Sequence, residues 1–423
     1  MEKGLKKDLL GWLGLSSLFA FLLSAGVVFA DEFHYRNFIP GERAAGMGGA
    51  YTAISDDPSG AFHNPAGLAL IIGNKLSVNV NAYHVSDKSY VRVLPRTTGG
   101  ADDWTLRSSG LVPNFFGIAQ KFGPGVVGFS YAVTDSISRH QEQVFYNIKS
   151  RLPNRYISRY VININDEDKT YNIGPSYALE LSEKLSVGAT LYLHYRSARI
   201  IRNQLVTLDD GQFEWANGYR KNSEYGLKPI LGLMLSPVDK VSLGFTLSKV
   251  YLFKSDSRIQ GTYRGISSDG FGINRVDFAI LTNKEKRDLP YETKAGIAYF
   301  PTRTFLISAD LAYYTKTDDY EQVLNGAVGM EYYLRPSIAL RSGLFTDFAN
   351  TPKLKSNQTD QRERVDNYGA TLSLSYFTKN SAITVGAVYV YGTGKAQIIS
   401  GQTDIQNVRT NTISVFLGTS YSY

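Results

Sequence analysis

Cysteine is absent from this chain of 423 residues, which excludes a disulfide scaffold, a thiol nucleophile and thiolate metal ligands. The five histidines are dispersed and show no spacing that is typical of a metal site. After residue 30, no apolar run reaches the ~18 residues that a membrane-spanning helix needs. These absences remove disulfide-rich proteins, thiol enzymes and helical membrane proteins from the classes to be considered.

Motifs of enzyme chemistry are missing as well. Residues 46–49 begin like a dinucleotide-binding loop, but Tyr51 stands where the third glycine belongs. Residues 392–395 are followed by Ala396, whereas a phosphate-binding loop has serine or threonine after its lysine. Neither a calcium loop nor a nucleophile elbow is present. We therefore predict that the protein is not an enzyme and holds no catalytic residues, metal or cofactor.

The first 30 residues have the features of a secretory signal peptide. Three lysines among the first seven residues precede an apolar run over 13–28, and Ala30 is a small residue before the expected cut. An uncleaved membrane anchor is the alternative, but no basic stop-transfer flank follows the run. We predict that residues 1–30 are removed on export across the inner membrane.

The chain is basic, with 45 Lys and Arg against 38 Asp and Glu and a net charge of +7. A basic chain can indicate nucleic-acid binding. Here the charges are scattered over predicted loops and the chain carries an export signal, so we expect no nucleic-acid partner.

Long segments in which apolar residues alternate with small or polar ones recur along the chain, as expected for strands with two different faces. In residues 185–197, for example, Leu191 and Leu193 alternate with Tyr192 and His194. About fourteen such segments are predicted, and most have 11 to 14 residues. A tilted strand needs ~9–11 residues to cross a bilayer. The predicted strands are 75–85, 112–122, 126–136, 170–181, 185–197, 224–235, 240–251, 289–300, 304–316, 323–334, 338–347, 366–377, 382–392 and 408–423.

Six connections between these strands are tight turns, and the others are mostly long. The tight turns lie at 123–125, 182–184, 236–239, 301–303, 335–337 and 378–381. Short periplasmic turns and long external loops are typical of an outer-membrane barrel. We predict an all-β fold, a transmembrane antiparallel β-barrel of about 14 strands over residues 75–423. A soluble β-sandwich is the structural alternative, but its strands usually have ~5–6 residues.

Two surface features predict partners of the barrel. The last strand alternates from Ile413 and ends in Tyr423, which resembles the signal read by the barrel-assembly machinery, although it also suits an ordinary closing strand. Residues 137–169 mix basic and apolar residues, which suits outer-membrane lipid and the phosphates of lipopolysaccharide. A plain solvated loop is the alternative for this segment. We expect a monomer.

Residues 31–74 precede the first strand and do not have a strand pattern. They are rich in Gly, Ala, Ser and Asp, and Asp57-Pro58 and Asn64-Pro65 each look like an N-cap followed by proline at the first helical position. A barrel of fourteen strands has a lumen that its own side chains cannot close. We predict that residues 31–74 form an N-terminal hatch that plugs the lumen.

The chain resembles a known family, the FadL-type outer-membrane transporters. The resemblance rests on the glycines Gly46, Gly48 and Gly49, on the sequence Asn64-Pro65-Ala66, and on its position between a signal peptide and a barrel pattern. It covers essentially the whole mature chain. It implies a fourteen-stranded barrel with a hatch and passive uptake of a hydrophobic small molecule, from long-chain fatty acids to aromatic hydrocarbons.

The resemblance also implies a route for the ligand. In that family the ligand is thought to be captured by the third and fourth external loops, here 198–223 and 252–288, and to leave sideways at a kink in the third strand. Gly125 and Gly128 are the candidates for that kink, because glycine weakens a strand ladder. The alternative is that these glycines only ease packing against the hatch.

Successive side chains of a strand point to opposite faces, and this alternation (parity) places two pairs of opposite charges on the luminal face. Glu331 and Arg341 lie five residues either side of Pro336, and Lys294 and Asp310 lie eight either side of Thr302. Symmetric turns would set each pair directly opposite, where opposite charges contribute roughly 0.2–1 kcal/mol. Such cations could meet a carboxylate head group, but we favour a structural role that joins the hatch to the wall.

Two other functions remain open on the same fold. A FadL-like subunit of a secretion system would bind and present cargo rather than conduct it. A general porin would pass small hydrophilic solutes, and a plugged lumen disfavours it.

Overall fold

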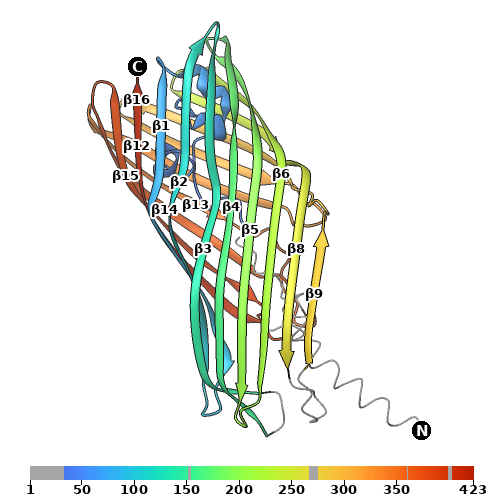
Figure 1. Cartoon of the computed structure of the whole chain (residues 1–423). Coiled ribbons are helices and arrows are strands. Elements are labelled where there is room, and N and C mark those ends of the chain that lie inside the picture. The colour runs from blue at the N-terminus through green and yellow to red at the C-terminus, as the bar shows by residue number, and fades with distance from the viewer. Residues whose placement is uncertain (1–32, 151–153, 266–274, 360, 399–402) are drawn as a thin grey trace.

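The computed structural model describes residues 33–150, 154–265, 275–359, 361–398 and 403–423, so the predicted signal peptide at 1–30 lies outside the described residues. Sixteen strand segments form one antiparallel sheet, and pairing between β5 and β6 closes it into a barrel (Figure 1). In chain order the segments are β1 Lys75–Pro95, β2 Ala101–Phe122, β3 Gly125–Lys149, β4 Tyr156–Ser182, β5 Leu185–Leu208, β6 Phe213–Val238, β7 Val241–Lys249, β8 Tyr251–Gly265, β9 Arg275–Asn283, β10 Tyr291–Thr302, β11 Phe305–Tyr314, β12 Val323–Arg335, β13 Ile338–Asp347, β14 Arg364–Phe377, β15 Ser381–Ala396 and β16 Gln406–Ser422.

These sixteen segments make fourteen barrel strands, which confirms the predicted number. β7 and β8 are separated only by Val250, and both pair with β6, so they are two parts of one strand. β9 pairs with β8 and β10 pairs with β7, so β9 and β10 are the two parts of the next strand, interrupted at 284–290. The barrel is therefore closed but has two neighbouring strands that break at the same level.

The strands of the first half continue far beyond their predicted ends. β3 pairs with β4 as far as Lys149 and Tyr156, and β5 pairs with β6 as far as Thr207 and Phe213. The assignment of 137–169, 198–223 and 252–288 to external loops is therefore wrong for most of their length. These strands run the length of the molecule in Figure 1, whereas β12 to β15 end sooner.

A physical reason explains why the extensions were missed. Along β5 the outward residues change from Leu193 and Tyr195 to Ser197 and Arg199, while Arg196 faces inward and is buried. Beyond this level the apolar residues no longer keep to the outer face: Ala198 and Ile200 are buried inside the barrel together with the polar Gln204, whereas Arg199 faces outward. The apolar-outward alternation therefore disappears although the backbone hydrogen bonds continue.

A row of outward tyrosines marks this level. The ring centroids of Tyr131 and Tyr171 are 6.1 Å apart, those of Tyr171 and Tyr195 6.0 Å, and those of Tyr195 and Tyr225 4.9 Å. Exposed leucines lie on the turn side of this tyrosine row, for example Leu193 with 58% exposure. Aromatic rings at one edge of an apolar band are typical of the boundary between lipid and water.

Residues 33–74, the hatch, lie inside the barrel near the end that carries the short turns and the C-terminus (Figure 1). They contain the short helices α2 Glu42–Gly46 and α3 Gly60–His63 and the 3-10 helix η1 Pro65–Leu70. None of the helices in the described residues is long and apolar enough to span a membrane. Met47, Tyr51 and other hatch residues pack against wall residues such as Phe345 and Phe416 in a buried core.

Wall glycines allow the hatch backbone to touch the barrel. At each of six luminal positions, a Cβ would lie less than 2.5 Å from a hatch atom. These positions, the glycine belt, are Gly188, Gly232, Gly244, Gly329, Gly343 and Gly418. The belt runs through β5, β6, β7, β12, β13 and β16, so the hatch is seated on opposite sides of the lumen.

Candidate functional site

The Asn64-Pro65-Ala66 sequence anchors the hatch to β6. Asn64 Oδ1 accepts a hydrogen bond from the backbone N–H of Ala66 at 3.1 Å, which caps η1 with Pro65 as its first residue. Asn64 Nδ2 donates to the carbonyl oxygen of Thr52 at 2.8 Å and to that of Leu233 at 3.1 Å. One fully buried side chain thus makes hydrogen bonds to backbone groups of both the hatch and the wall. These bonds give the motif a structural role.

The three hatch glycines on which the family resemblance rests, Gly46, Gly48 and Gly49, also occupy positions that require glycine. Gly48 and Gly49 have φ values of 65° and 79°, in the left-handed region where other residues are strained. Gly46 ends α2, and a Cβ there would overlap the Ser373 hydroxyl of β14. All three positions therefore serve the fit of the hatch inside the barrel.

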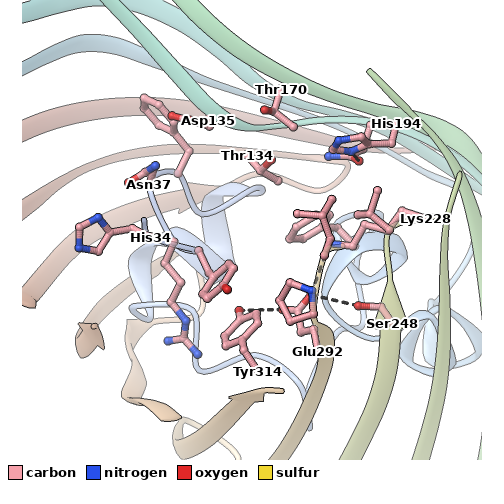
Figure 2. Close-up of a pocket in the computed structure, with 18 of the residues that line it drawn as sticks. His34, Asn37, Thr134, Asp135, Thr170, His194, Lys228, Ser248, Glu292 and Tyr314 are labelled. Carbon is pink, nitrogen blue, oxygen red and sulfur yellow. Dashed lines mark hydrogen bonds and ion pairs between the residues drawn. The ribbon is translucent and has the colours of Figure 1, made fainter. Parts of the chain in front are cut away.

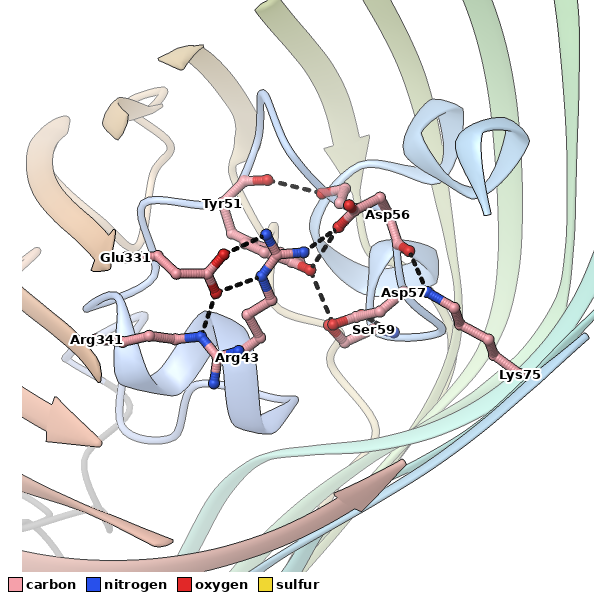
Figure 3. A network of polar contacts seen from close by, with 9 residues as sticks. Arg43, Tyr51, Asp56, Asp57, Ser59, Lys75, Glu331 and Arg341 are labelled. Carbon is pink, nitrogen blue, oxygen red and sulfur yellow. Dashed lines mark hydrogen bonds and ion pairs between the residues drawn. The ribbon is translucent and has the colours of Figure 1, made fainter. Parts of the chain in front are cut away.

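A buried ion network ties the hatch to the opposite wall (Figure 3). Glu331 lies directly opposite Arg341 in the register of β12 and β13, and the two are ion-paired. Arg43 of the hatch donates to both oxygens of Glu331, at 2.9 Å and 2.8 Å, and to Asp56 at 2.5 Å. The hydroxyl of Tyr51 donates to Asp57 at 2.8 Å. We call the group Arg43, Glu331 and Arg341 the latch.

The electrostatics of the latch favour its charged form. Burial alone would lower the pKa of Arg43, but Asp56 and Glu331 raise it well above its ordinary value. Glu331 is 1% exposed, so its carboxylate depends on the two guanidinium groups for its stabilisation. The geometry of the latch is that of a structural tie between hatch and wall.

The second predicted pair, Lys294 with Asp310, does not form. The register places Lys294 opposite Ala312 and Asp310 opposite Gly296, because the turn between β10 and β11 is centred on Arg303 rather than on Thr302, which moves each partner by two residues. Lys294 instead pairs with Glu292 at 2.8 Å. Asp310 accepts hydrogen bonds from the backbone N–H groups of Tyr51 and Thr52, at 3.0 Å and 2.8 Å, so it holds the hatch.

Above the hatch, a cavity with a volume of about 200 Å³ spans the lumen (Figure 2). We call it the chamber. Hatch residues 34–40 form one side of it, with Thr134 and Asp135 of β3 beside them. The other side is formed by β6, β7, β10 and β11, which contribute among others Lys228, Ser248 and Tyr314.

The chamber has more positive than negative groups. Six of its lining residues are lysine or arginine and two are acidic. Lys228 and Lys294 share the single carboxylate of Glu292, at 3.4 Å and 2.8 Å. Both ammonium groups also lie over the ring of Phe62, with 4.9 Å and 5.5 Å to its centroid. This cluster of three charged groups and one ring therefore has a formal charge of +1.

Arg36 adds a second positive charge from the hatch side. Its backbone N–H donates to Asp347, and its guanidinium reaches the carbonyl oxygen of Gly326 at 3.5 Å. Among the described residues we find no carboxylate within ion-pair distance of this guanidinium. His63 adds no charge, because burial and the nearby Lys294 lower the pKa of its imidazole to about 3.

The wall beside the chamber contains a seam between β2 and β3. The two strands are ladder-paired only from Phe115 and Ala132 toward the short turn. Farther out, residues 101–114 of β2 face 133–147 of β3 without a backbone ladder in the described structure, and side chains bridge them instead. Ser108 Oγ, for example, donates to the carbonyl oxygen of Ser138 at 3.0 Å and accepts from its N–H at 3.2 Å.

Phe38 of the hatch covers the inner end of this seam. Its N–H donates to the carbonyl oxygen of Thr134 at 3.3 Å, and its ring packs with Val112 and Val133. The register of β3 against β4 shifts between Val133 and Asp135, so a bulge lies at this point. Gly125 and Gly128 are paired regularly on both sides and lie closer to the turn. A kink at these two glycines thus stays a prediction, and the irregularity that we observe is at 133–135.

Comparison with known proteins identifies the family. The sequence model of the family described as outer membrane protein transport protein (OMPP1/FadL/TodX) matches residues 24–272. The chain belongs to this family. It is therefore an outer-membrane β-barrel of the FadL type, from a family of transport proteins rather than of enzymes. A comparison with curated proteins found no match.

Solved structures of other proteins share this FadL-type fold. A Pseudomonas aeruginosa FadL homologue has a TM-score of 0.61 at 14% identity, with 92% of this chain and 99% of that chain covered. The P. putida toluene transporter TodX gives 0.62 at 14% identity, with 90% and 98% covered. The CymD monoaromatic hydrocarbon channel gives 0.58 at 16% identity, with 92% and 99% covered. At these identities the similarity establishes the fold alone.

Several site residues of this FadL-type barrel were missed at the sequence level. Arg43, Lys228, Glu292 and Phe38 come from segments far apart in the chain, and only the closed barrel brings them together. Parity offered a usable signal for Lys228 and Glu292, because charged residues on luminal positions of a membrane strand are candidates for a site. No pattern in the hatch sequence distinguishes Arg36 or Phe38 from their neighbours.

Proposed function

We propose that this FadL-type protein passively carries hydrophobic molecules with an anionic head group, of the long-chain fatty-acid type, across the outer membrane. The charge of the chamber carries this proposal. Lys228 and Lys294 share one carboxylate, and Arg36 has none among the described residues. A ligand carboxylate at this place would accept charge-assisted hydrogen bonds, which are roughly twice as strong as neutral ones.

A pure hydrocarbon would gain little from the same chamber. Its transfer from water is favourable in proportion to the apolar area that it buries. Placed against ammonium and guanidinium groups, it would displace their water without giving a hydrogen bond, which is costly. The chamber charge therefore favours a fatty-acid-type ligand over an aromatic hydrocarbon or an alkane.

The route out would pass through the seam. The chamber reaches Thr134 and Asp135 at the β3 bulge, where Phe38 covers the inner end of the seam. Movement of one aromatic ring and breakage of a few side-chain hydrogen bonds would open the wall there, whereas between regularly paired neighbours such as β13 and β14 a full backbone ladder would have to break. Export by the predicted signal peptide, contacts with lipopolysaccharide and recognition of the last strand by the assembly machinery belong to the same proposal.

The test compares two ligands of equal length, hexadecanoate and hexadecane. Protein purified in an unrelated detergent is subjected to lipid extraction and native mass spectrometry, and affinities are then measured for Arg36→Gln and Lys228→Gln. Loss of a charged hydrogen-bond partner costs about 1.5–3 kcal/mol, so we expect hexadecanoate to bind roughly 10- to 150-fold more weakly. Hexadecane binding should not change.

A matched control is Lys316→Gln, which removes an exposed ammonium outside the chamber. Equal weakening of both ligands by the chamber variants would contradict the proposed selectivity. If no small molecule binds but a protein partner persists through purification, the protein is a binding subunit rather than a transporter.

A further inference from the structure

A row of outward cations crosses three neighbouring strands of the extended wall. Arg199 of β5 lies directly opposite Lys221 of β6, and Lys221 lies directly opposite Arg258 of β8. All three side chains are exposed. Neighbouring strands are about 4.8 Å apart, so the three positions span roughly 10 Å of the outer surface. We call these three residues the cationic row, and the strands that carry it lie side by side in Figure 1.

The cationic row contains more positive charge than its neighbours compensate. Glu167 of β4 lies opposite Arg199 and pairs with it at 3.0 Å. Among the described residues, no carboxylate lies within ion-pair distance of Lys221 or Arg258. Like charges that lie directly opposite each other on paired strands are destabilising. The row is therefore unfavourable in the barrel alone, and a bound anion would offset the repulsion.

Two further lysines lie at or just beyond the level of the tyrosine row. Lys169 of β4 faces outward two residues beyond the tyrosine of that strand. The ammonium of Lys254 on β8 lies 5.5 Å from the ring centroid of Tyr225 and pairs with Asp256 at 3.1 Å. With the cationic row this face holds five cations, against the two carboxylates of Glu167 and Asp256, so its formal charge is +3.

The outward residues of these strands change in layers. Along β5 they change from apolar to aromatic to hydroxyl to cationic, in the order Leu193, Tyr195, Ser197 and Arg199. β6 has the same layers in the order Leu227, Tyr225, Ser223 and Lys221. Four residues of a tilted strand place the cationic row roughly 10 Å beyond the tyrosine row along the membrane normal. A phospholipid head-group layer is only about 5–8 Å thick, so the row lies at the level of a larger head group.

We infer that the cationic row binds the phosphorylated sugar head group of lipopolysaccharide in the outer leaflet. The guanidinium groups of Arg199 and Arg258 suit bidentate contacts with phosphate, and Lys221 is a point charge between them. The hydroxyls of Ser197 and Ser223, which lie opposite each other one layer below, can donate to the same head group. The acyl chains lie against the leucines below the tyrosine row.

This site gives the lipopolysaccharide contact of the proposed function a definite place, and it rests on that part of the proposal. It lies on the outer face of the wall, whereas the chamber lies inside the lumen. Binding of the glycolipid and binding of a transported ligand can therefore be measured separately.

The test measures binding of lipid A, with and without its phosphates, to the full chain in detergent by native mass spectrometry. The variants are Lys221→Gln, Arg258→Gln and the double change. We expect each single change to weaken binding of phosphorylated lipid A roughly fivefold, and the double change about 25-fold. Lipid A without phosphates should bind weakly and equally to all variants.

A matched control is Arg107→Gln on the outer face of β2. Arg107 is also exposed, at 67%, but it is paired with Asp87 at 2.7 Å, so its removal should leave lipid A binding unchanged. Folding is checked by urea-induced unfolding. Because Lys221→Gln removes like-charge contacts on both sides, it should not destabilise the barrel in the absence of lipid A, but it should gain less stability from lipid A than the wild type does.

Undiminished binding of phosphorylated lipid A by the double variant would overturn the site. Equal binding of phosphatidylglycerol and lipid A by the wild type would overturn its assignment to lipopolysaccharide. Hexadecanoate affinity, measured in the same samples, should be equal in all variants. If hexadecanoate binds and lipid A does not, the site fails while the proposed transport stands; the opposite result supports the site and contradicts the transport.

Discussion

Removing the carboxylate of the latch should destabilise the barrel strongly. The change is Glu331→Gln, which keeps the volume of the side chain but removes its charge. Glu331 is 1% exposed and Arg341 3% exposed, so the freed guanidinium of Arg341 is left without its carboxylate in a buried site. Breaking a buried ion pair by removing one partner costs about 3–5 kcal/mol. Arg43 loses less, because it keeps Asp56 at 2.5 Å.

The assay is urea-induced unfolding in lipid vesicles, followed by the fluorescence of Trp104, which is buried, and of Trp215. The variants are Glu331→Gln, Glu331→Met, Arg341→Met and the double change to Met at both positions. Because an apolar pair can replace a buried ion pair at little cost, the double variant should be more stable than Glu331→Met alone. A coupling free energy of at least ~1 kcal/mol is expected.

A surface pair provides the matched control. Lys316 and Glu321 are 2.9 Å apart, but their side chains are 63% and 36% exposed, so Glu321→Gln should cost no more than about 1 kcal/mol. If the single changes at the latch add up within ~0.5 kcal/mol, the two residues do not interact and our account of the latch is wrong.

Three further outcomes follow from the structure. Burial and the nearby Asp57 raise the pKa of Glu42 from its ordinary value of 4.5 to about 7, so the stability from its neutral form is complete below pH 4.5 and is lost as the pH rises through 7. Glu42→Gln should therefore abolish the loss of unfolding free energy between about pH 4.5 and 7, and an unchanged pH profile would contradict this. A disulfide between cysteines at Ser108 and Ser138 should trap bound ligand by closing the seam, with release restored by reductant; continued release in the oxidised form would rule out that exit. Gly244→Ala should expose the hatch to protease, because a Cβ would overlap the Thr52 carbonyl, whereas a methyl at the outward Gly326 has no neighbour closer than 3.9 Å; equal digestion of both variants would refute the seating of the hatch.

Much of the fold follows from alternation in the sequence, and the errors have definable causes. The Glu331–Arg341 register could be predicted because a symmetric turn surrounds Pro336. The Lys294–Asp310 prediction failed because a shift of two residues keeps every side chain on the same face, so parity cannot detect it. The external extensions of β1 to β6 were missed because their outward residues turn polar while their inward residues mix charged and apolar side chains, as Arg199, Arg196 and Ile200 of β5 illustrate.

The candidate site was the least predictable part. The latch joins Arg43 to Glu331, which are 288 residues apart in sequence, and no local pattern specifies such a contact. The hatch motif was found, but its role became clear only when Asn64 was seen to donate to Leu233 on the wall. The interruption at 284–290 could not be recognised, because most of it lay within the predicted external loop 252–288, and the strands on either side of it were not predicted there.

The glycine belt has a consequence for biogenesis. The hatch touches β5 and β6 on one side of the lumen and β13 and β16 on the other, at positions where not even a methyl group fits. A hatch seated so tightly would be hard to insert through a finished ring. Because β1 follows the hatch directly and pairs with β16, the two ends of the barrel sequence meet where the hatch is attached. So close a fit favours closure of the wall around a hatch that is already in place over later insertion of the hatch.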